Sequence, residues 1–223
     1  MDEPVDDLQF SKRPRTLKGS TSLFREEANF IQLPPPPANS SLDTAKELLA
    51  VQGASYIRKG AIEKSIKKHD KDPAFSVKLY MSIFGLKYDQ KYIDRVLRES
   101  SVIISGLKNK FNRPRPKQLG PYFGMDVDVL KSASAKTPSY PSGHTTQARL
   151  IAEIYSAKYP EHRSNLVQAA EECGQGRIMA GLHFPKDHVV GRYLAKRLFK
   201  ALNPSTAIEY DQSYEVALKK RKK

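Results

Sequence analysis

The sequence predicts an all-α protein with a single helical-bundle domain, on the basis of three observations. Apolar residues recur at steps of three and four along most of the chain, as on the buried face of a helix. No segment shows the strict alternation that is typical of a half-buried strand. The chain has 223 residues, which is enough for one sizeable core and short for two.

The N-terminal residues 1–30 are expected to be poorly ordered or extended. The piece SKRPRTLKGSTS is basic and rich in turn formers, and it has no periodic apolar face. The segment QLPPPPANSS follows, and its four consecutive prolines favour polyproline II and exclude a helix. Ser40 or Ser41 can then cap the first helix.

From residue 42 to about residue 203 the apolar pattern is helical, and we expect six to nine helices. Loops are expected at 112–143 and near 181–186, and residues 204–223 are expected to form a C-terminal helix and a basic tail that ends in KKRKK. Four apolar stripes have helical spacing. They are Leu42, Ala45 and Leu49; Ile93, Val96, Leu97, Ser100, Ile104, Leu107 and Phe111; Ala148, Ile151, Ala152 and Tyr155; and Val190, Leu194, Leu198 and Leu202.

The charge balance points to anionic partners. The 38 Lys and Arg outnumber the 24 Asp and Glu, for a formal net charge of +14, which suits phosphate compounds, nucleic acid or acidic membrane surfaces. The single cysteine, Cys173, excludes an internal disulfide. The opening MDEPVDDLQF lacks the apolar core of a signal peptide, and no apolar run approaches the ~18 residues of a membrane span. We therefore expect a cytoplasmic protein that is not integral to a membrane, or a periplasmic or secreted one if a signal has been removed.

The first of three polar clusters is KNKFNRPRP, Lys108 to Pro116. Lys108 follows the long apolar stripe, and Pro114 and Pro116 hold Arg115 in an extended segment. Two interpretations are open. The cluster is either a charged helix end, where cations are favoured by the helix dipole, or a pair of ligands for an anion.

The second cluster is PSGH, Pro141 to His144, just ahead of a helix that is expected to begin near His144. The Ser142 hydroxyl and the Gly143 amide would lie at the helix N-terminus, where free amide groups bind anions well. A simple N-cap is the alternative.

The third cluster is GRIMAGLHFPKDH, Gly176 to His188, in which Arg177 ends an apolar helix. His183 and Asp187 are four apart and are expected to share a helix face. Asp187 could then fix the imidazole tautomer and leave the other nitrogen free as a nucleophile. The rival is a metal site of His183, Asp187 and His188. On a helix His188 would point away from Asp187, so no residue supplies a good third ligand.

Together the clusters contain three cations, a hydroxyl, a glycine amide, two histidines and an aspartate, a set that suits phosphoryl transfer. Fixed cations and amides stabilise the charge on a transferring phosphoryl group. One imidazole can attack phosphorus, and a second, protonated, can give its proton to the leaving alcohol. The other histidines, His69 and His162, lie in polar sequence and are expected at the surface.

The three clusters resemble K-x6-R-P, P-S-G-H and S-R-x5-H-x3-D, the signature of the type 2 phosphatidic acid phosphatase (PAP2) superfamily. Within it the chain is most similar to bacterial class A non-specific acid phosphatases, which carry a similar LPPPP segment, here Leu33 to Pro37. They also read similarly around Glu172, Gly174 and Gln175. The resemblance covers about residues 31–203 and implies an acid phosphatase domain there. Gly176 replaces the signature serine, so we expect activity to survive with an altered rate.

The resemblance also implies roles for individual residues. His183 would be the nucleophile that forms a phosphohistidine, Asp187 would orient it, and His144 would be the general acid and later the base. The implied phosphate-binding residues are Lys108, Arg115, Ser142, Gly143 and Arg177. No metal and no cofactor are implied, because the cations take the place of a metal.

The expected function is therefore hydrolysis of small phosphate monoesters. The alternatives are a lipid-phosphate phosphatase acting at a membrane surface, a vanadium-dependent haloperoxidase, and a basic binding module. Contacts of the basic termini with an anionic surface or nucleic acid, and a homodimer or larger homo-oligomer, are further partner hypotheses.

Overall fold

The computed structural model describes residues 4–203, and this part of the chain is helical without a β-strand. A single isolated bridge pairs Phe24 with Leu202. The helices are α1 (Leu42–Tyr56), α2 (Ala61–Lys71), α3 (Phe75–Ile83), α4 (Gln90–Phe111), the single-turn α5 (Pro116–Leu119), α6 (Gly143–Lys158), α7 (Arg163–Met179) and α8 (Pro185–Lys200). The all-α prediction is confirmed, whereas the expected C-terminal helix and basic tail lie outside the described residues.

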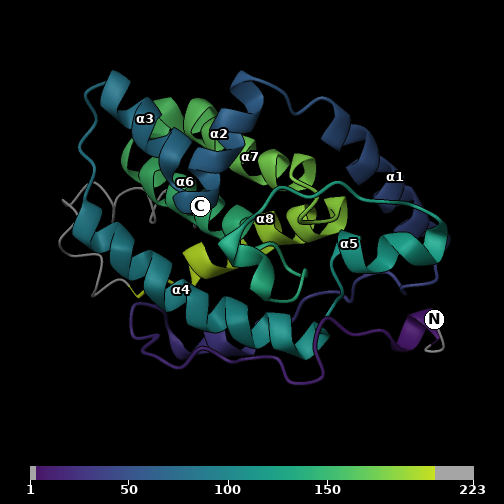
Figure 1. Cartoon of the computed structure of the whole chain (residues 1–223). Coiled ribbons are helices and arrows are strands. Elements are labelled where there is room, and N and C mark those ends of the chain that lie inside the picture. Colours follow the sequence, from purple (N-terminus) through teal and green to yellow (C-terminus); the bar gives the residue numbers. More distant parts are fainter. Residues whose placement is uncertain (1–3, 204–223) are drawn as a thin grey trace.

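Helix α6 is the central element of the bundle (Figure 1). It packs mainly against α7 and α8 and also contacts α4, while α1, α2 and α3 pack on α7. Because neighbours surround it, α6 buries residues on most of its faces, including Leu150, Ile151 and Tyr155. No helix in the described part of the chain has the length and apolar character that crossing a bilayer requires.

Three of the four predicted apolar stripes lie in the core, and the stripe on α1 does not. Leu42 and Leu49 are 70% and 56% exposed, so the prediction of this face is wrong. The buried side of α1 carries Leu48 and Val51 instead, which pack in a separate cluster with Phe184. Helix α1 has apolar residues on two sides, and only the position of its neighbours decides which side is covered.

The described part of the N-terminal segment, residues 4–41, is extended apart from 3-10 turns at Val5–Asp7 and Glu26–Phe30. It runs along α4 (Figure 1). Leu23 and Phe24 are buried in the main core, and the Leu23 amide donates a 2.7 Å hydrogen bond to the Glu99 carboxylate on α4. The segment is therefore part of the packed structure over much of its length.

His69 is buried, which contradicts its expected place at the surface. Its Nε2 lies 2.7 Å from the Ser76 hydroxyl, and that hydroxyl donates a 2.7 Å hydrogen bond to Glu172 on α7. His162 is partly exposed, with Nδ1 2.8 Å from the Tyr80 hydroxyl. The prediction from polar sequence neighbours is wrong at His69, because α2 directs this side chain toward α3 and α7.

Truncating the centre of α6 is expected to destabilise the fold strongly. Leu150→Ala should lower the free energy of unfolding by about 2–5 kcal/mol, since it removes a fully buried side chain from a packed core. Leu49→Ala, on the exposed face of α1, is the matched control and should change it by less than ~0.5 kcal/mol. Urea denaturation measures both, and equal losses would show that the assignment of buried faces is wrong.

Candidate active site

A pocket of about 320 Å³ opens between the C-terminal end of α4, the start of α6 and the loop before α8. Its wall includes Lys108, Arg115, Gly143, His144 and His183, which come from all three sequence clusters. Within residues 4–203, no aspartate or glutamate lines it. The structure therefore brings five of the eight predicted site residues into one positively charged cavity.

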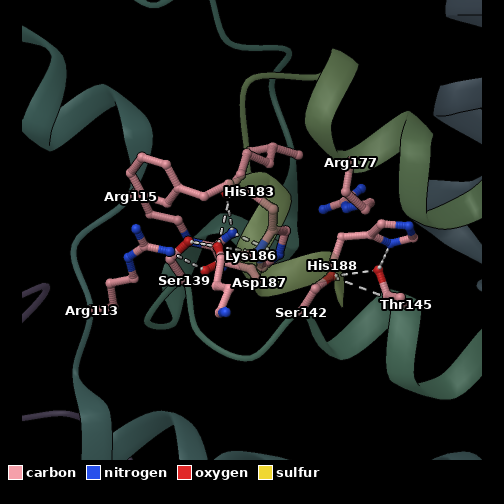
Figure 2. Close-up of polar contacts among 12 residues, drawn as sticks. Arg113, Arg115, Ser139, Ser142, Thr145, Arg177, His183, Lys186, Asp187 and His188 are labelled. Atoms are coloured by element: carbon pink, nitrogen blue, oxygen red, sulfur yellow. Dashed lines mark hydrogen bonds and ion pairs between the residues drawn. The ribbon is translucent and has the colours of Figure 1, made fainter. Parts of the chain in front are cut away.

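His183 lies in the loop before α8, so the expectation that it shares a helix face with Asp187 is wrong. Asp187 is in the first turn of α8, and its Oδ2 reaches back to accept hydrogen bonds from the Phe184 amide at 3.0 Å and from His183 Nδ1 at 3.2 Å (Figure 2). A carboxylate can only accept, so Nδ1 carries the proton. Nε2 is then unprotonated, and it lies 3.0 Å from the Arg115 guanidinium.

Asp187 is fully buried and joins all three clusters. Its Oδ1 accepts a 2.7 Å hydrogen bond from Arg113, and its Oδ2 accepts one from the Ser139 hydroxyl. Burial by itself would raise the pKa of Asp187, but the charge of Arg113 outweighs burial and lowers it, with help from His183 and Ser139. The carboxylate therefore stays ionised in the interior.

Sequence reasoning missed Arg113 and Ser139. Arg113 is buried between Asp187 and Glu47, with 2.7 Å to each carboxylate, and its guanidinium stacks 3.9 Å above the Phe184 ring. The available signal was position alone, because Arg113 lies inside the first cluster and Ser139 lies two residues before the second. Glu47 is on α1, where nothing in the sequence marks it.

Lys108 and Arg115 are buried cations whose close partners are neutral. Lys108 Nζ donates to the carbonyl of Pro138, while Arg115 donates to the carbonyls of Thr137 at 2.9 Å and Leu182 at 2.7 Å. Burial lowers the pKa of Lys108 well below its usual value, and nearby Arg115 lowers it further. Burial also lowers the pKa of Arg115 to about 9. An anion in the pocket would offset both penalties.

His144 lines the same pocket, and its Nε2 lies 3.1 Å from the carbonyl oxygen of Asp70. A carbonyl only accepts, so Nε2 carries a proton and Nδ1 is the nitrogen that can gain one. Burial, followed by the charge of Arg177, lowers the pKa of His144 to about 3. In the free protein the imidazole is therefore neutral.

Gly143 is the first residue of α6, so its amide belongs to the set that has no acceptor within the helix. A Cβ there would lie 3.6 Å from Ile104 and 3.7 Å from Lys108, inside the pocket wall. The helix therefore presents its positive end to the cavity without a side chain in between.

Ser142 and Arg177, two predicted phosphate ligands, do not line the pocket. The Ser142 hydroxyl is buried and caps α6, accepting from the amide of Thr145 at 3.4 Å and from its hydroxyl at 2.9 Å. Arg177 pairs with Asp70 at 2.6 Å and donates to Ser134 at 2.5 Å. Asp70 lies near the end of α2, and no sequence motif predicts its ion pair with Arg177.

His188 and the nearby glycines have packing roles. His188 joins Thr145 of α6 at 3.1 Å to Glu171 of α7 at 2.5 Å, so the rival metal set with His183 and Asp187 is not assembled. A Cβ on Gly174 would lie 2.2 Å from the His188 ring, which leaves room only for glycine. A Cβ on Gly176 would lie 3.3 Å from Ile66, so a serine at this position would make a tight contact with α2.

Comparisons with known proteins agree with this geometry. The family model described as "PAP2 superfamily" matches residues 96–207. An acid phosphatase of Zymomonas mobilis is 26% identical over 92% of this chain and 79% of its own length. A non-specific acid phosphatase of Salmonella typhimurium is 36% identical over 33% of this chain and 30% of its own length.

More distant similarities reach lipid phosphatases. A lipid A 1-phosphatase of Rhizobium etli is 29% identical over 51% of this chain and 46% of its own length. The crystal structure of a transmembrane PAP2 type phosphatidylglycerolphosphate phosphatase from Bacillus subtilis superposes with a TM-score of 0.53 at 19% identity, over 78% of this chain and 90% of that one. At 19% identity, this structural similarity shows a shared fold alone. Since the family model covers half of the chain and the site unites that family's three motifs, the chain belongs to the PAP2 superfamily.

Proposed function

We propose that this protein is a phosphatase that hydrolyses phosphate monoesters without a metal, through a phosphohistidine intermediate on His183. One observation carries the proposal. The Nε2 atom of His183 is unprotonated and faces a cavity lined by buried cations, while Nδ1 is held by Asp187. Membership of the PAP2 superfamily and the similarity to acid phosphatases support phosphatase activity.

In the first step, the phosphoryl group lies between Lys108, Arg115 and the N-terminus of α6. The phosphate oxygens accept hydrogen bonds from the Arg115 guanidinium in place of His183 Nε2. The lone pair of Nε2 is then free to attack phosphorus in line. The ester P–O bond breaks as the P–N bond forms. The bound phosphate raises the pKa of His144, so its Nδ1 takes up a proton from solvent when the ester binds and gives it to the leaving alcohol, while Asp187 stabilises the positive imidazole of His183.

In the second step, His144 has become the base. Its Nδ1 takes a proton from a water molecule, whose oxygen attacks phosphorus as the P–N bond breaks. Inorganic phosphate leaves, and His183 returns to the form with a proton on Nδ1 only. Lys108 and Arg115 supply the charge stabilisation that a metal ion provides in other phosphatases.

A lipid-phosphate phosphatase is the second candidate, favoured by the similarity to the Rhizobium etli enzyme. A comparison of p-nitrophenyl phosphate with phosphatidic acid in mixed micelles, both in EDTA, separates the two. We expect faster turnover of the soluble ester. Much faster turnover of the lipid would favour this second candidate, and complete loss of activity in EDTA would contradict the metal-independent mechanism.

Removing the nucleophile is expected to abolish turnover. His183→Ala should lower kcat for p-nitrophenyl phosphate by at least about 10⁴-fold. In the wild-type protein, rapid quenching at alkaline pH should trap an acid-labile phosphate on His183, detectable by mass spectrometry. Full activity in His183→Ala, or a phosphate trapped on another residue, would contradict the mechanism.

His144 is expected to control the alkaline limb of the pH profile. The pKa of about 3 keeps the imidazole neutral in the free protein, and a bound phosphate dianion raises this pKa. The donor form is then lost as pH rises through the raised pKa, so kcat should fall on that side. His144→Asn should lower kcat by about 10²–10⁴-fold and remove this limb. An unchanged profile would show that another group donates the proton.

Arg113 is expected to act through Asp187 as a positioning residue. Without its charge the pKa of the buried carboxylate should rise, and the ionised form should be lost as pH falls through that higher value. Arg113→Ala should therefore move the acid limb of kcat/KM to higher pH and lower kcat about tenfold.

Two variants serve as controls for Arg113→Ala. Arg113→Lys keeps a cation beside Asp187 and should restore part of the rate, and Glu47→Gln leaves the contact between Arg113 and Asp187 in place. If Arg113→Ala lowers stability without moving the acid limb, then Arg113 is a structural residue only.

A further inference from the structure

The N-terminal segment forms one wall of the active-site pocket. Arg15 and Leu17 both line the cavity, although they lie outside the region that the family model matches. Hydrogen bonds hold this segment on α4. The Leu17 amide donates to the Ser105 hydroxyl at 3.0 Å, and Asn109 donates to the Thr16 hydroxyl at 2.7 Å. Lys108 lines the same cavity as Arg15 and Leu17, so the segment, which runs along α4 (Figure 1), borders the pocket beside an inner cation of the site.

A second exposed cation, Lys136, ends the 3-10 turn Ala133–Lys136 in the loop between α5 and α6, and it also lines the cavity. The inner cation Arg115 fixes this loop through donation to the Ser134 carbonyl at 3.2 Å and to the Thr137 carbonyl at 2.9 Å. The pocket therefore has a buried pair of cations, Lys108 and Arg115, and an exposed pair, Arg15 and Lys136.

The exposed pair has no acidic partner to neutralise it. Within residues 4–203, no carboxylate lines the pocket, and neither Arg15 nor Lys136 forms a side-chain ion pair or hydrogen bond. Many exposed lysines and arginines elsewhere in residues 4–203 are also unpaired, so what sets Arg15 and Lys136 apart is their position at the cavity. Two unpaired cations at the rim of a cavity attract an anionic group on its ligand.

The cavity is larger than one phosphoryl group requires. At about 320 Å³ it has the size of a site for a small organic molecule, and Leu17 and Ile104 add apolar surface for a carbon skeleton. We infer that the pocket selects small phosphomonoesters whose alcohol part carries a second anionic group, a phosphate or a carboxylate, which Arg15 and Lys136 bind. This inference rests on the proposed function, since it names the substrate class of the same site.

A matched pair of substrates tests the inference. At the end of the molecule away from the phosphate, 3-phosphoglycerate carries a carboxylate and glycerol 3-phosphate carries a hydroxymethyl group. We expect kcat/KM to favour 3-phosphoglycerate by about tenfold at low salt, the effect of two exposed ion pairs, and the preference to shrink as ionic strength rises. The variant Arg15→Ala/Lys136→Ala should lose the preference. The readout is the ratio of kcat/KM for the two substrates, because a general effect of the substitutions on turnover cancels in this ratio.

The control variant is Lys91→Ala/Lys196→Ala, which removes the same charge from two exposed positions that do not line the pocket. Lys91 is about 25 Å from Lys108 along α4, so this variant should keep the preference. A preference that is absent in the wild type, or that both double variants lose equally, would overturn the inference while leaving the phosphatase function standing.

A binding measurement distinguishes the two possible failures. Calorimetric titration with 3-phosphonopropionate and propylphosphonate needs no turnover, and the wild type should bind the ligand with two anionic groups about tenfold more tightly. If no ester is hydrolysed but this difference is present and is lost in Arg15→Ala/Lys136→Ala, the proposed function fails and the subsite stands. Equal affinities for the two ligands would refute the subsite.

Discussion

The buried carboxylate of Asp187 is the interaction on which the site depends. It accepts hydrogen bonds from Arg113, Ser139, the Phe184 amide and His183, and its own backbone carbonyl accepts one from the amide of Ser142. These donors come from the loop after α4, the loop before α6 and the loop before α8. A buried ionised group that lost one of these donors would carry a large desolvation cost, so the carboxylate holds three segments in fixed relation.

The cations around this carboxylate show how the protein separates structural charge from functional charge. Arg113 is neutralised by Asp187 and Glu47 and has no surface on the pocket. Lys108 and Arg115 have carbonyl oxygens as close partners, and burial lowers the pKa values of both side chains. Neutral carbonyls orient these side chains without cancelling their charge, so the cavity remains attractive to an anion before any ligand arrives.

The two histidines are prepared in opposite ways by their partners. Asp187 holds the Nδ1 proton of His183 and leaves Nε2 as a nucleophile, while the Asp70 carbonyl holds the Nε2 proton of His144 and leaves Nδ1 to gain one. Burial lowers the pKa of both. The tautomer of His183 suits attack on phosphorus, and the tautomer of His144 suits proton transfer. Each tautomer is set by the ring nitrogen that donates to an oxygen that can only accept a hydrogen bond.

The sequence by itself determined the helical class and most of the buried faces, because periodicity is a local property. That Lys108, Arg115, Gly143, His144 and His183 would lie together was implied by the resemblance of three motifs to one family signature. The sequence also placed His183 and Asp187 within contact, although the reason was wrong: the carboxylate caps the first turn of α8 instead of sharing a helix face with the imidazole. Only the tertiary structure decided that Arg113 pairs with Glu47 and Asp187, that Arg177 pairs with Asp70, and that Arg15 reaches the pocket. Each of these contacts joins residues far apart in the chain, and their formation depends on how α1, α2 and the N-terminal segment pack, which no local pattern encodes.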